Sequence, residues 1–287
     1  MTSLPAAEMD STLSSADYAR LANILNRELG IKLPGNKRVM LEGRLRPRMR
    51  TLGFDSYRAY CEHLFQQGAL QQEMSFLIDA VTTNKTDFFR EPGHFSLLAQ
   101  KLVPTLLSNR PKAGAPLIKV WSAASSNGAE PYTIAMTLQE LVRARPGFRF
   151  AVLGTDISTR VLEQGKKAIY PVDQVIPVPA ELRQRYLLQS LDPKGPKQVR
   201  IIPELRRLVT FSRLNLMDED YPVDRDVDVI FLRNVLIYFE KTDQEAVVRR
   251  LLGHLRPGGY LILGHSEAMI GSGMGLKQIA PAVFGKD

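Results

Sequence analysis

The sequence has almost no cysteine and no long apolar run. Cys61 is the single cysteine among 287 residues, so no disulfide can form within the chain. This composition favours a reducing compartment. No apolar run approaches the roughly 18 residues that indicate a membrane-spanning helix. The first ten residues carry two acids and no basic segment, unlike a signal peptide. We therefore expect a soluble, cytoplasmic protein without membrane insertion.

Phosphate-binding loops and metal-ligand spacings are also missing. No P-loop pattern occurs, and the four histidines do not have the spacing of a metal site, so no metal is expected. What the sequence does contain is 44% hydrophobic and 24% charged residues, enough for a sizeable core. Its formal charge of +8 fits an acidic partner, whether nucleic acid, anionic lipid or an acidic protein.

The first third of the chain is helical in pattern. Residues 1–13 are small and polar and predict a flexible tail. Over residues 14–80 the apolar residues recur at helical spacing, with glycine and proline between the runs, which predicts a bundle of about four helices. Residues 81–92 follow as a linker, and the pattern changes from residue 93 to residue 287.

The remainder alternates between strands and helices. Short apolar runs at 117–121, 150–155, 227–232 and 260–264 predict strands, with helices expected over 129–144, from Ser158, and over 242–255. This order is typical of a mainly parallel sheet covered by helices on both faces. Residues 168–206 hold six prolines and are too long for a simple connection, so we expect an inserted subdomain of a few short strands.

The turn after the first strand favours a nucleoside ligand without a pyrophosphate. Dinucleotide enzymes need G-x-G-x-x-G here, whereas residues 122–128 read SAASSNG and contain one glycine. Asp156 ends the second strand, where a carboxylate can accept the hydroxyls of a ribose. The alternative is that Asp156 only stabilises the helix that begins after it. Position alone leaves both interpretations open.

Five segments together resemble the CheR family of chemoreceptor glutamate methyltransferases. They are VTTNKTDFFR at 81–90, WSAA at 121–124 continuing to GAEPY at 128–132, DIS at 156–158, FLRNVLIYF at 231–239 and GHSE at 264–267. The resemblance implies a class I S-adenosylmethionine-dependent methyltransferase fold: a Rossmann-like α/β domain with an N-terminal helical domain and a small inserted β-subdomain. It implies methyl transfer from S-adenosylmethionine to glutamate carboxylates, with S-adenosylhomocysteine as the product.

The resemblance also assigns roles to residues. Asn84, Thr86 and Arg90 would approach the methionine end of the cofactor, and Arg90 would orient the substrate carboxylate. Tyr238 would lie near the methyl group, as a second catalytic residue. The remaining cofactor-binding residues would be Glu130, Asp156, Asn215, Leu216, Arg233 and Asn234. Simpler interpretations exist for some of them: Glu130 can be a first-turn helix acid and Tyr238 a half-buried tyrosine.

A basic stretch in the N-terminal domain is expected to dock on the receptor. Chemoreceptor methylation helices are acidic, and a basic helix could steer association with them. The predicted docking residues are Lys37, Arg38, Arg44, Arg46, Arg48 and Arg50. A solvated basic face is the alternative. In some members of this family the inserted subdomain binds a tether peptide at the receptor's C-terminus, which the sequence neither supports nor opposes here.

Two rival functions share this fold. A nucleic-acid methyltransferase would suit the charge, but such enzymes often carry a Pro-Pro-aromatic motif or a nucleophilic cysteine near the fourth strand, where this chain has Arg233-Asn234-Val235-Leu236. A non-catalytic, cofactor-binding receptor adaptor is the second rival. The segments around the methyl site are intact, which disfavours it, and the sequence predicts no nucleic-acid partner.

Overall fold

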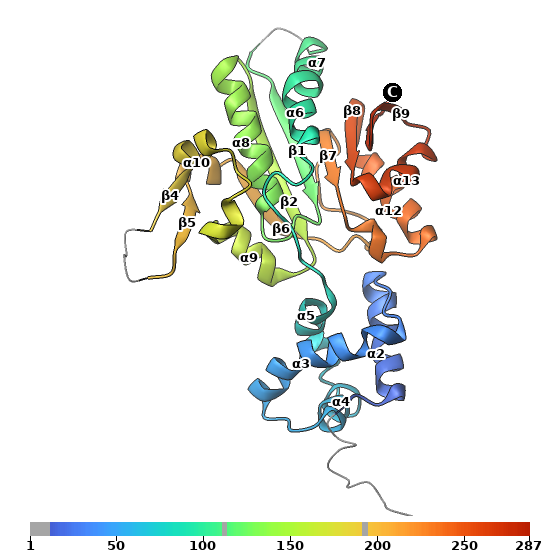
Figure 1. The fold of residues 1–287 in the computed structure, drawn as a ribbon. Helices are drawn as coiled ribbons and strands as arrows, with labels where there is room; N and C mark the ends of the chain where they lie inside the picture. The colour runs from blue at the N-terminus through green and yellow to red at the C-terminus, as the bar shows by residue number, and fades with distance from the viewer. Residues whose placement is uncertain (1–11, 111–113, 191–194) are drawn as a thin grey trace, which may run out of the picture. The chain divides into compact units, whose positions relative to one another are not determined.

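The computed structural model describes residues 12–110, 114–190 and 195–287, and these form two compact units. One unit comprises the chain up to Thr83 together with Tyr238–Glu240, and the other comprises Asn84–Ile237 and Lys241–Asp287. Within the described residues, no helix is both long and apolar enough to cross a bilayer. Figure 1 shows the elements of both units.

Four α-helices lie in the described part of the N-terminal unit, in agreement with the predicted bundle. They are α2 (Ser15–Leu29), α3 (Arg38–Leu52), α4 (Tyr57–Phe65) and α5 (Leu70–Val81), with a 3-10 turn η1 (Gly35–Lys37) before α3. Ser14 and Ser56 cap α2 and α4 by accepting hydrogen bonds from backbone amides of their first turns. Among the apolar residues at helical spacing, Leu21, Leu25 and Leu41 are fully buried.

The flexible tail was predicted to extend to residue 13, but the structure places Leu13 in the folded helical unit. Residues 1–11 lie outside the described part of the chain, but Leu13 is fully buried. Its backbone N–H donates to Glu42 Oε1 at 2.9 Å. Burial of an apolar side chain together with a satisfied amide fixes this position in the helical unit. The sequence pattern could not reveal this, because the partner lies in another helix.

A seven-stranded sheet forms the centre of the second unit. Its order is β6-β2-β1-β7-β8-β10-β9. The predicted strands are confirmed as β1 (Leu117–Ala123), β2 (Arg149–Asp156), β7 (Val227–Leu232) and β8 (Leu255–Leu263), and β6 (Val209–Arg213) pairs with β2. These five strands run parallel, whereas β10 (Val283–Gly285) pairs antiparallel with both β8 and β9 (Lys277–Ala280). Strands β9 and β10 were not predicted, because each is only three or four residues long.

Helices connect the strands and cover the sheet (Figure 1). A helical segment of α6 (Gly93–Leu97), the π-helical turn η2 (Leu98–Leu102) and α7 (Val103–Ser108) precedes β1. The later helices are α8 (Ala129–Ala144), α9 (Thr159–Lys167), α12 (Lys241–His254) and α13 (Ala268–Ser272), with 3-10 turns η4 (Leu236–Tyr238) and η5 (His265–Glu267). All six residues of β7 are buried, as expected of a strand at the centre of a doubly covered sheet.

The predicted insertion folds as a separate small sheet. Its antiparallel strands lie in the order β3 (Ile169–Pro171), β5 (Gln198–Ile201), β4 (Leu187–Gln189). The 3-10 turn η3 (Val172–Val175) and helices α10 (Ala180–Tyr186) and α11 (Pro203–Arg206) complete it. Figure 1 shows this sheet, in gold, beyond α8 and α9 at the side of the larger sheet. Glu140 of α8 accepts hydrogen bonds from Tyr186 and Arg185, which fastens α10 to the main body.

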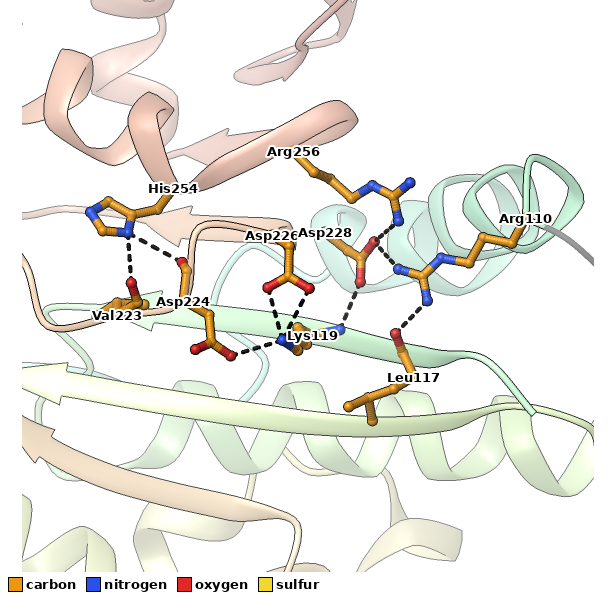
Figure 2. Close-up of polar contacts among 9 residues, drawn as sticks. All are labelled: Arg110, Leu117, Lys119, Val223, Asp224, Asp226, Asp228, His254 and Arg256. Atoms are coloured by element: carbon orange, nitrogen blue, oxygen red, sulfur yellow. Dashed lines mark hydrogen bonds and ion pairs between the residues drawn. The ribbon is translucent and has the colours of Figure 1, made fainter. Parts of the chain in front are cut away.

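The buried carboxylate of Asp228 connects the amino ends of β1 and β7 (Figure 2). Asp228 is fully buried, and its Oδ2 accepts the backbone N–H of Lys119 at 2.8 Å. Its Oδ1 pairs with Arg110 at 2.5 Å and Arg256 at 3.2 Å. A buried carboxylate needs such partners, and here they tie three elements to β7. This network lies at the edge of the sheet opposite the carboxyl ends of the strands.

Candidate functional site

The carboxyl ends of four parallel strands meet at one edge of the sheet. The register pairs Ala123 of β1 with Thr155 of β2 and with Leu232 of β7, while Asp156 pairs with Arg213 of β6. The loops that follow these strands therefore lie side by side. Ligands of open α/β sheets bind at this edge, so the geometry selects the predicted segments as the candidate site.

Asp156 joins two of these loops. Its carboxylate accepts the N–H of Ser126 at 2.9 Å and the N–H of Ser158 at 3.0 Å, and the residue is 7% exposed. Ser158 in turn caps α9 by accepting from Val161 N–H. Asp156 thus supports a helix start, as the simpler interpretation held, and also shapes the loop after β1. Ala124 and Ser126 in that loop have positive φ (59° and 50°), which is uncommon for residues other than glycine and typical of functional turns.

The predicted adenine-side residues lie next to Asp156. The backbone carbonyl of Asp156 accepts the N–H of Leu214, which brings Asn215 and Leu216 to the same edge. Leu216 is buried, and its carbonyl accepts hydrogen bonds from Tyr221 Oη at 2.7 Å and Arg250 at 3.0 Å. An apolar side chain held this way can form a wall for a flat, uncharged ring.

Arg233 is the centre of a buried ion-pair network. Its side chain is 2% exposed and donates to Glu130 Oε2 at 2.9 Å. It lies 3.2 Å from Glu91 Oε2 and donates to the backbone carbonyl of Arg90 at 2.5 Å. Glu130 also accepts from Ser122 Oγ at 2.7 Å. Glu130 and Arg233 were both predicted as cofactor-binding residues, and that role stays a prediction. The structure pairs them with each other, because a buried guanidinium requires carboxylates around it.

Glu91 was not singled out by the sequence, although it follows Arg90 directly. Burial opposes its ionisation, but the positive charges of Arg233 and, to a lesser degree, His265 and His94 outweigh that effect and hold the pKa of Glu91 below its usual value. Phe89 and Glu91 both have positive φ (54° and 56°), on either side of Arg90. The network therefore holds Arg90 in a strained turn that its own residue types disfavour.

The Arg90 guanidinium is much less constrained than its backbone. The side chain is half-buried, and its one hydrogen bond within the described residues is a long contact of 3.4 Å from Nη1 to the carbonyl of Lys85. Asn84, at the start of this segment, accepts a hydrogen bond from Ser126 Oγ through its carbonyl at 2.9 Å. Thr86 lies between them and is half-buried. Of the three predicted residues, Asn84 is thus in contact with the loop after β1, and the Arg90 carbonyl is held by Arg233.

Asn234 is held by a second residue that the sequence did not assign. The carboxylate of Glu267 accepts N–H groups from Asn234 and Leu236, both at 2.8 Å, and from Gly264 at 2.9 Å. These bonds fix Asn234 at a positive φ of 58°. Burial raises the pKa of Glu267 despite the amides around it. Gly264 is required here, since a Cβ would lie 2.6 Å from Glu267 Oε2.

Tyr238 belongs to the N-terminal unit, where its carbonyl accepts the N–H of Lys32 at 3.1 Å. Its side chain is half-buried. The catalytic role predicted for it stays a prediction.

The basic residues around α3 divide into two groups. Lys37, Arg44, Arg46 and Arg50 are exposed. Arg48, by contrast, donates two hydrogen bonds to the buried Glu73 at 2.8 and 2.5 Å and lies over the Phe76 ring. Arg38 pairs with Glu42 at 3.2 Å. Arg48 therefore has a structural ion-pair role, because Glu73 needs a cation inside the unit. Its predicted part in receptor docking stays a prediction.

Two family models match the chain. The model described as "CheR methyltransferase, SAM binding domain" matches residues 84–282, and "CheR methyltransferase, all-alpha domain" matches residues 16–82. A chemotaxis protein methyltransferase of Borreliella burgdorferi is 36% identical over 280 residues, which cover 97% of each chain. The chemotaxis protein methyltransferase of Salmonella typhimurium is 39% identical over 257 residues (89% of this chain, 84% of the relative), and that of Escherichia coli is 38% identical over 257 residues (89% and 85%).

Proposed function

The chain belongs to the CheR family of S-adenosylmethionine-dependent chemotaxis protein methyltransferases, and from this premise we propose how its residues esterify glutamate side chains of chemoreceptors. The observation that carries the proposal is the convergence of Asp156, Leu216 and the strained Arg90 turn on one edge of the sheet. We propose that the nucleoside and the carboxylate-orienting group come together at that edge.

The reaction needs little acid–base chemistry from the protein. A glutamate carboxylate has a reference pKa near ~4.3 and is ionised at neutral pH, so the substrate supplies its own nucleophile. S-adenosylmethionine supplies the methyl group. The protein's own residues then act by holding the two reactants in line and excluding water.

The residues proposed to hold the cofactor fit its chemistry. S-adenosylmethionine has ribose hydroxyls but no phosphate, and the site offers the Asp156 carboxylate in place of a glycine-rich loop. We assign the ribose to Asp156, the adenine to Asn215 and Leu216, and the methionine end to Asn84 and Thr86. Glu130, Arg233 and Asn234 are assigned to the same pocket. Glu130 and Arg233 would also stabilise the pocket itself, because each neutralises the charge of the other.

Arg90 is proposed to orient the substrate. An arginine can hold a carboxylate by two parallel hydrogen bonds. Its guanidinium makes one long contact among the described residues, which leaves donors for a ligand, while its backbone is fixed by Arg233. The carboxylate loses charge as the ester forms, so a tight ground-state clamp would slow the reaction. We therefore assign Arg90 an orienting role. Tyr238 is proposed to face the methyl group, and Tyr238→Phe tests whether its hydroxyl contributes to turnover.

Receptor recognition is assigned to the exposed basic residues of the N-terminal unit. Lys37, Arg44, Arg46 and Arg50 would face the acidic methylation helices of the receptor, and Arg38 would contribute at their edge. The inserted subdomain offers a second contact. A cavity of about 710 Å³ is lined there by Val172, Val175 and Leu187, with Arg183 and Lys197 among its polar residues. Since β4 is an edge strand of the small sheet, an extended tether peptide could add to it.

The test uses S-adenosylmethionine labelled in the methyl group and cytoplasmic fragments of chemoreceptors from the same organism. Alkali is added after incubation, and labelled methanol is collected. Release by alkali is expected, because it identifies a carboxyl methyl ester. Label that is stable to alkali would show another acceptor, such as a nucleic acid. Cofactor binding without any label transfer would instead support a non-catalytic receptor adaptor.

A further inference from the structure

A cluster of two histidines and a glutamate lies beside the Arg233 network. His94 Nδ1 is 3.5 Å from Glu91 Oε2, and His265 Nε2 is 3.8 Å from the same oxygen. One ligand atom from each of the three residues lies within 4.8 Å of the others. The two imidazole rings meet edge to face, with centroids 5.0 Å apart. The histidines are far apart in sequence, which is why spacing alone predicted no metal site.

Hydrogen bonding does not account for this cluster. His94 is 4% exposed, and although its ring lies near the Pro281 backbone carbonyl, neither ring nitrogen makes a hydrogen bond of good geometry among the described residues. Glu91 Oε2 is buried and has an ion pair but no hydrogen bond there. Buried polar atoms are nearly always satisfied, so an imidazole without a good hydrogen bond, beside a carboxylate oxygen and a second imidazole, points to a ligand shared by the three groups.

We propose that Glu91, His94 and His265 bind one divalent transition-metal ion, with Zn²⁺ as the ion whose chemistry fits best. Zn²⁺ is bound by imidazole nitrogen and carboxylate oxygen at about 2.0–2.2 Å, which puts neighbouring ligands of a tetrahedral site roughly 3.3 Å apart. The observed separations of 3.5 and 3.8 Å are close to this value. His265 is 61% exposed and can rotate to close the remaining gap. Three protein ligands leave one position for water.

The local charge permits a cation at this place. Arg233 is the nearest fixed positive charge, 3.2 Å from Glu91 Oε2, and would repel an ion. Its charge is shared with a second carboxylate, however, since Glu130 lies 2.9 Å away on its other nitrogen. Two carboxylates facing one guanidinium leave an excess of negative charge for the ion to balance. This inference goes beyond the proposed function and does not depend on it.

The experiment titrates the full-length chain, free of any histidine tag, with ZnCl₂ by calorimetry and with CoCl₂ by visible absorption. The wild type is compared with His265→Ala, His94→Ala and the control His63→Ala. His63 is a partly exposed histidine of the N-terminal unit, hydrogen-bonded to Gln67. Circular dichroism checks that each variant folds. His265 is largely exposed, so its replacement keeps the test valid even where loss of the buried His94 unfolds the chain.

We expect one ion to bind per chain, with the absorption of nitrogen-coordinated Co²⁺. The affinity of His265→Ala for the metal should be at least about tenfold weaker than that of the wild type, which is the scale of effect seen when contacts of a metal site are lost. His63→Ala should bind like the wild type. The proposal is overturned if the wild type binds no ion, if His265→Ala binds as tightly as the wild type, or if His63→Ala abolishes binding.

Discussion

Arg233 and Glu130 form an ion pair of 2.9 Å between the end of β7 and the first turn of α8, and both side chains are largely buried. Two strand ends of the sheet are thereby joined across the candidate site. The same guanidinium holds the Arg90 carbonyl, so a single residue links the cofactor edge to the segment proposed to orient the substrate.

Replacing Arg233 should destabilise the fold. Arg233→Ala leaves Glu91 and Glu130 buried without their cation, and breaking a buried pair costs about 3–5 kcal/mol. Arg233→Lys should lose less stability than Arg233→Ala, because lysine keeps the positive charge although it lacks the paired donors of a guanidinium. Urea unfolding followed by circular dichroism measures the difference. Arg249→Ala, in an exposed pair with Glu245, is the control and should change stability by less than about 1 kcal/mol. Equal stability of Arg233→Ala and wild type would contradict the buried network.

Asp156 should contribute mainly to cofactor binding. Asp156→Asn keeps the size of the side chain and one acceptor but removes the charge, so calorimetry should show affinity for S-adenosylmethionine at least about tenfold weaker, as expected for a lost charged hydrogen bond. Asp173→Asn, an exposed acid of the inserted subdomain, is the control. Wild-type affinity in a folded Asp156→Asn protein would leave this residue with only its structural contacts to Ser126 and Ser158.

Arg90 should affect turnover more than cofactor affinity. Arg90→Ala removes the orienting group, and misplacement of a reactant can cost about 100-fold in rate. Affinity for S-adenosylmethionine should change much less. Methyl transfer to receptor fragments and calorimetry on the same preparations separate the two effects. Lys85→Ala serves as the control, because Lys85 is an exposed neighbour in the same segment. Unchanged turnover would remove Arg90 from the proposed mechanism.

The long parallel strands of the large sheet could be predicted because buried strands have a recognisable local sequence pattern. A parallel strand covered on both faces is a continuous apolar run, as in VDVIFL of β7. The short β9 and β10 have no such run: β10 depends on pairing with β8, and β9 depends on pairing with β10. Local pattern is therefore sufficient for the long central strands and insufficient for these two short strands.

The sequence allowed candidate residues for binding the cofactor to be selected. It did not allow the contacts among the residues of the site to be predicted. Asp156 could be selected because it follows a strand at the edge where ligands bind. The role of Glu91 could not, because its partners Arg233 and His265 come from distant parts of the chain. Arg48 shows the same limit: as a sequence feature it is one of several basic residues, and only folding brings it to Glu73.

The Arg48–Glu73 pair should make the helical unit sensitive to acid. Hydrogen bonds from Arg48 hold the pKa of Glu73 below its usual value, despite its burial. A lowered carboxyl pKa stabilises the fold above the unfolded pKa of ~4.3, and that stabilisation is lost as pH falls through the folded pKa. Glu73→Gln should therefore be less stable than wild type at pH 7, by about 2 kcal/mol. The gap should narrow below about pH 4. Unfolding curves across this range measure the difference in stability, with Glu62→Gln as the control, because Glu62 is only partly buried and pairs with the exposed Arg58. A difference independent of pH would contradict the ion pair.

Charge reversal on the exposed basic residues should slow receptor methylation without disturbing the cofactor site. Lys37 and Arg50 are exposed, so Lys37→Glu with Arg50→Glu should leave folding intact. Repulsion from acidic methylation helices should lower kcat/KM for receptor fragments roughly tenfold at low ionic strength, and salt should reduce the difference by screening. The matched control is Lys101→Glu with Arg145→Glu, which makes the same change in net charge at exposed positions of the other unit. Equal losses in both pairs would mean that overall charge, and not a docking surface on the helical unit, governs the encounter.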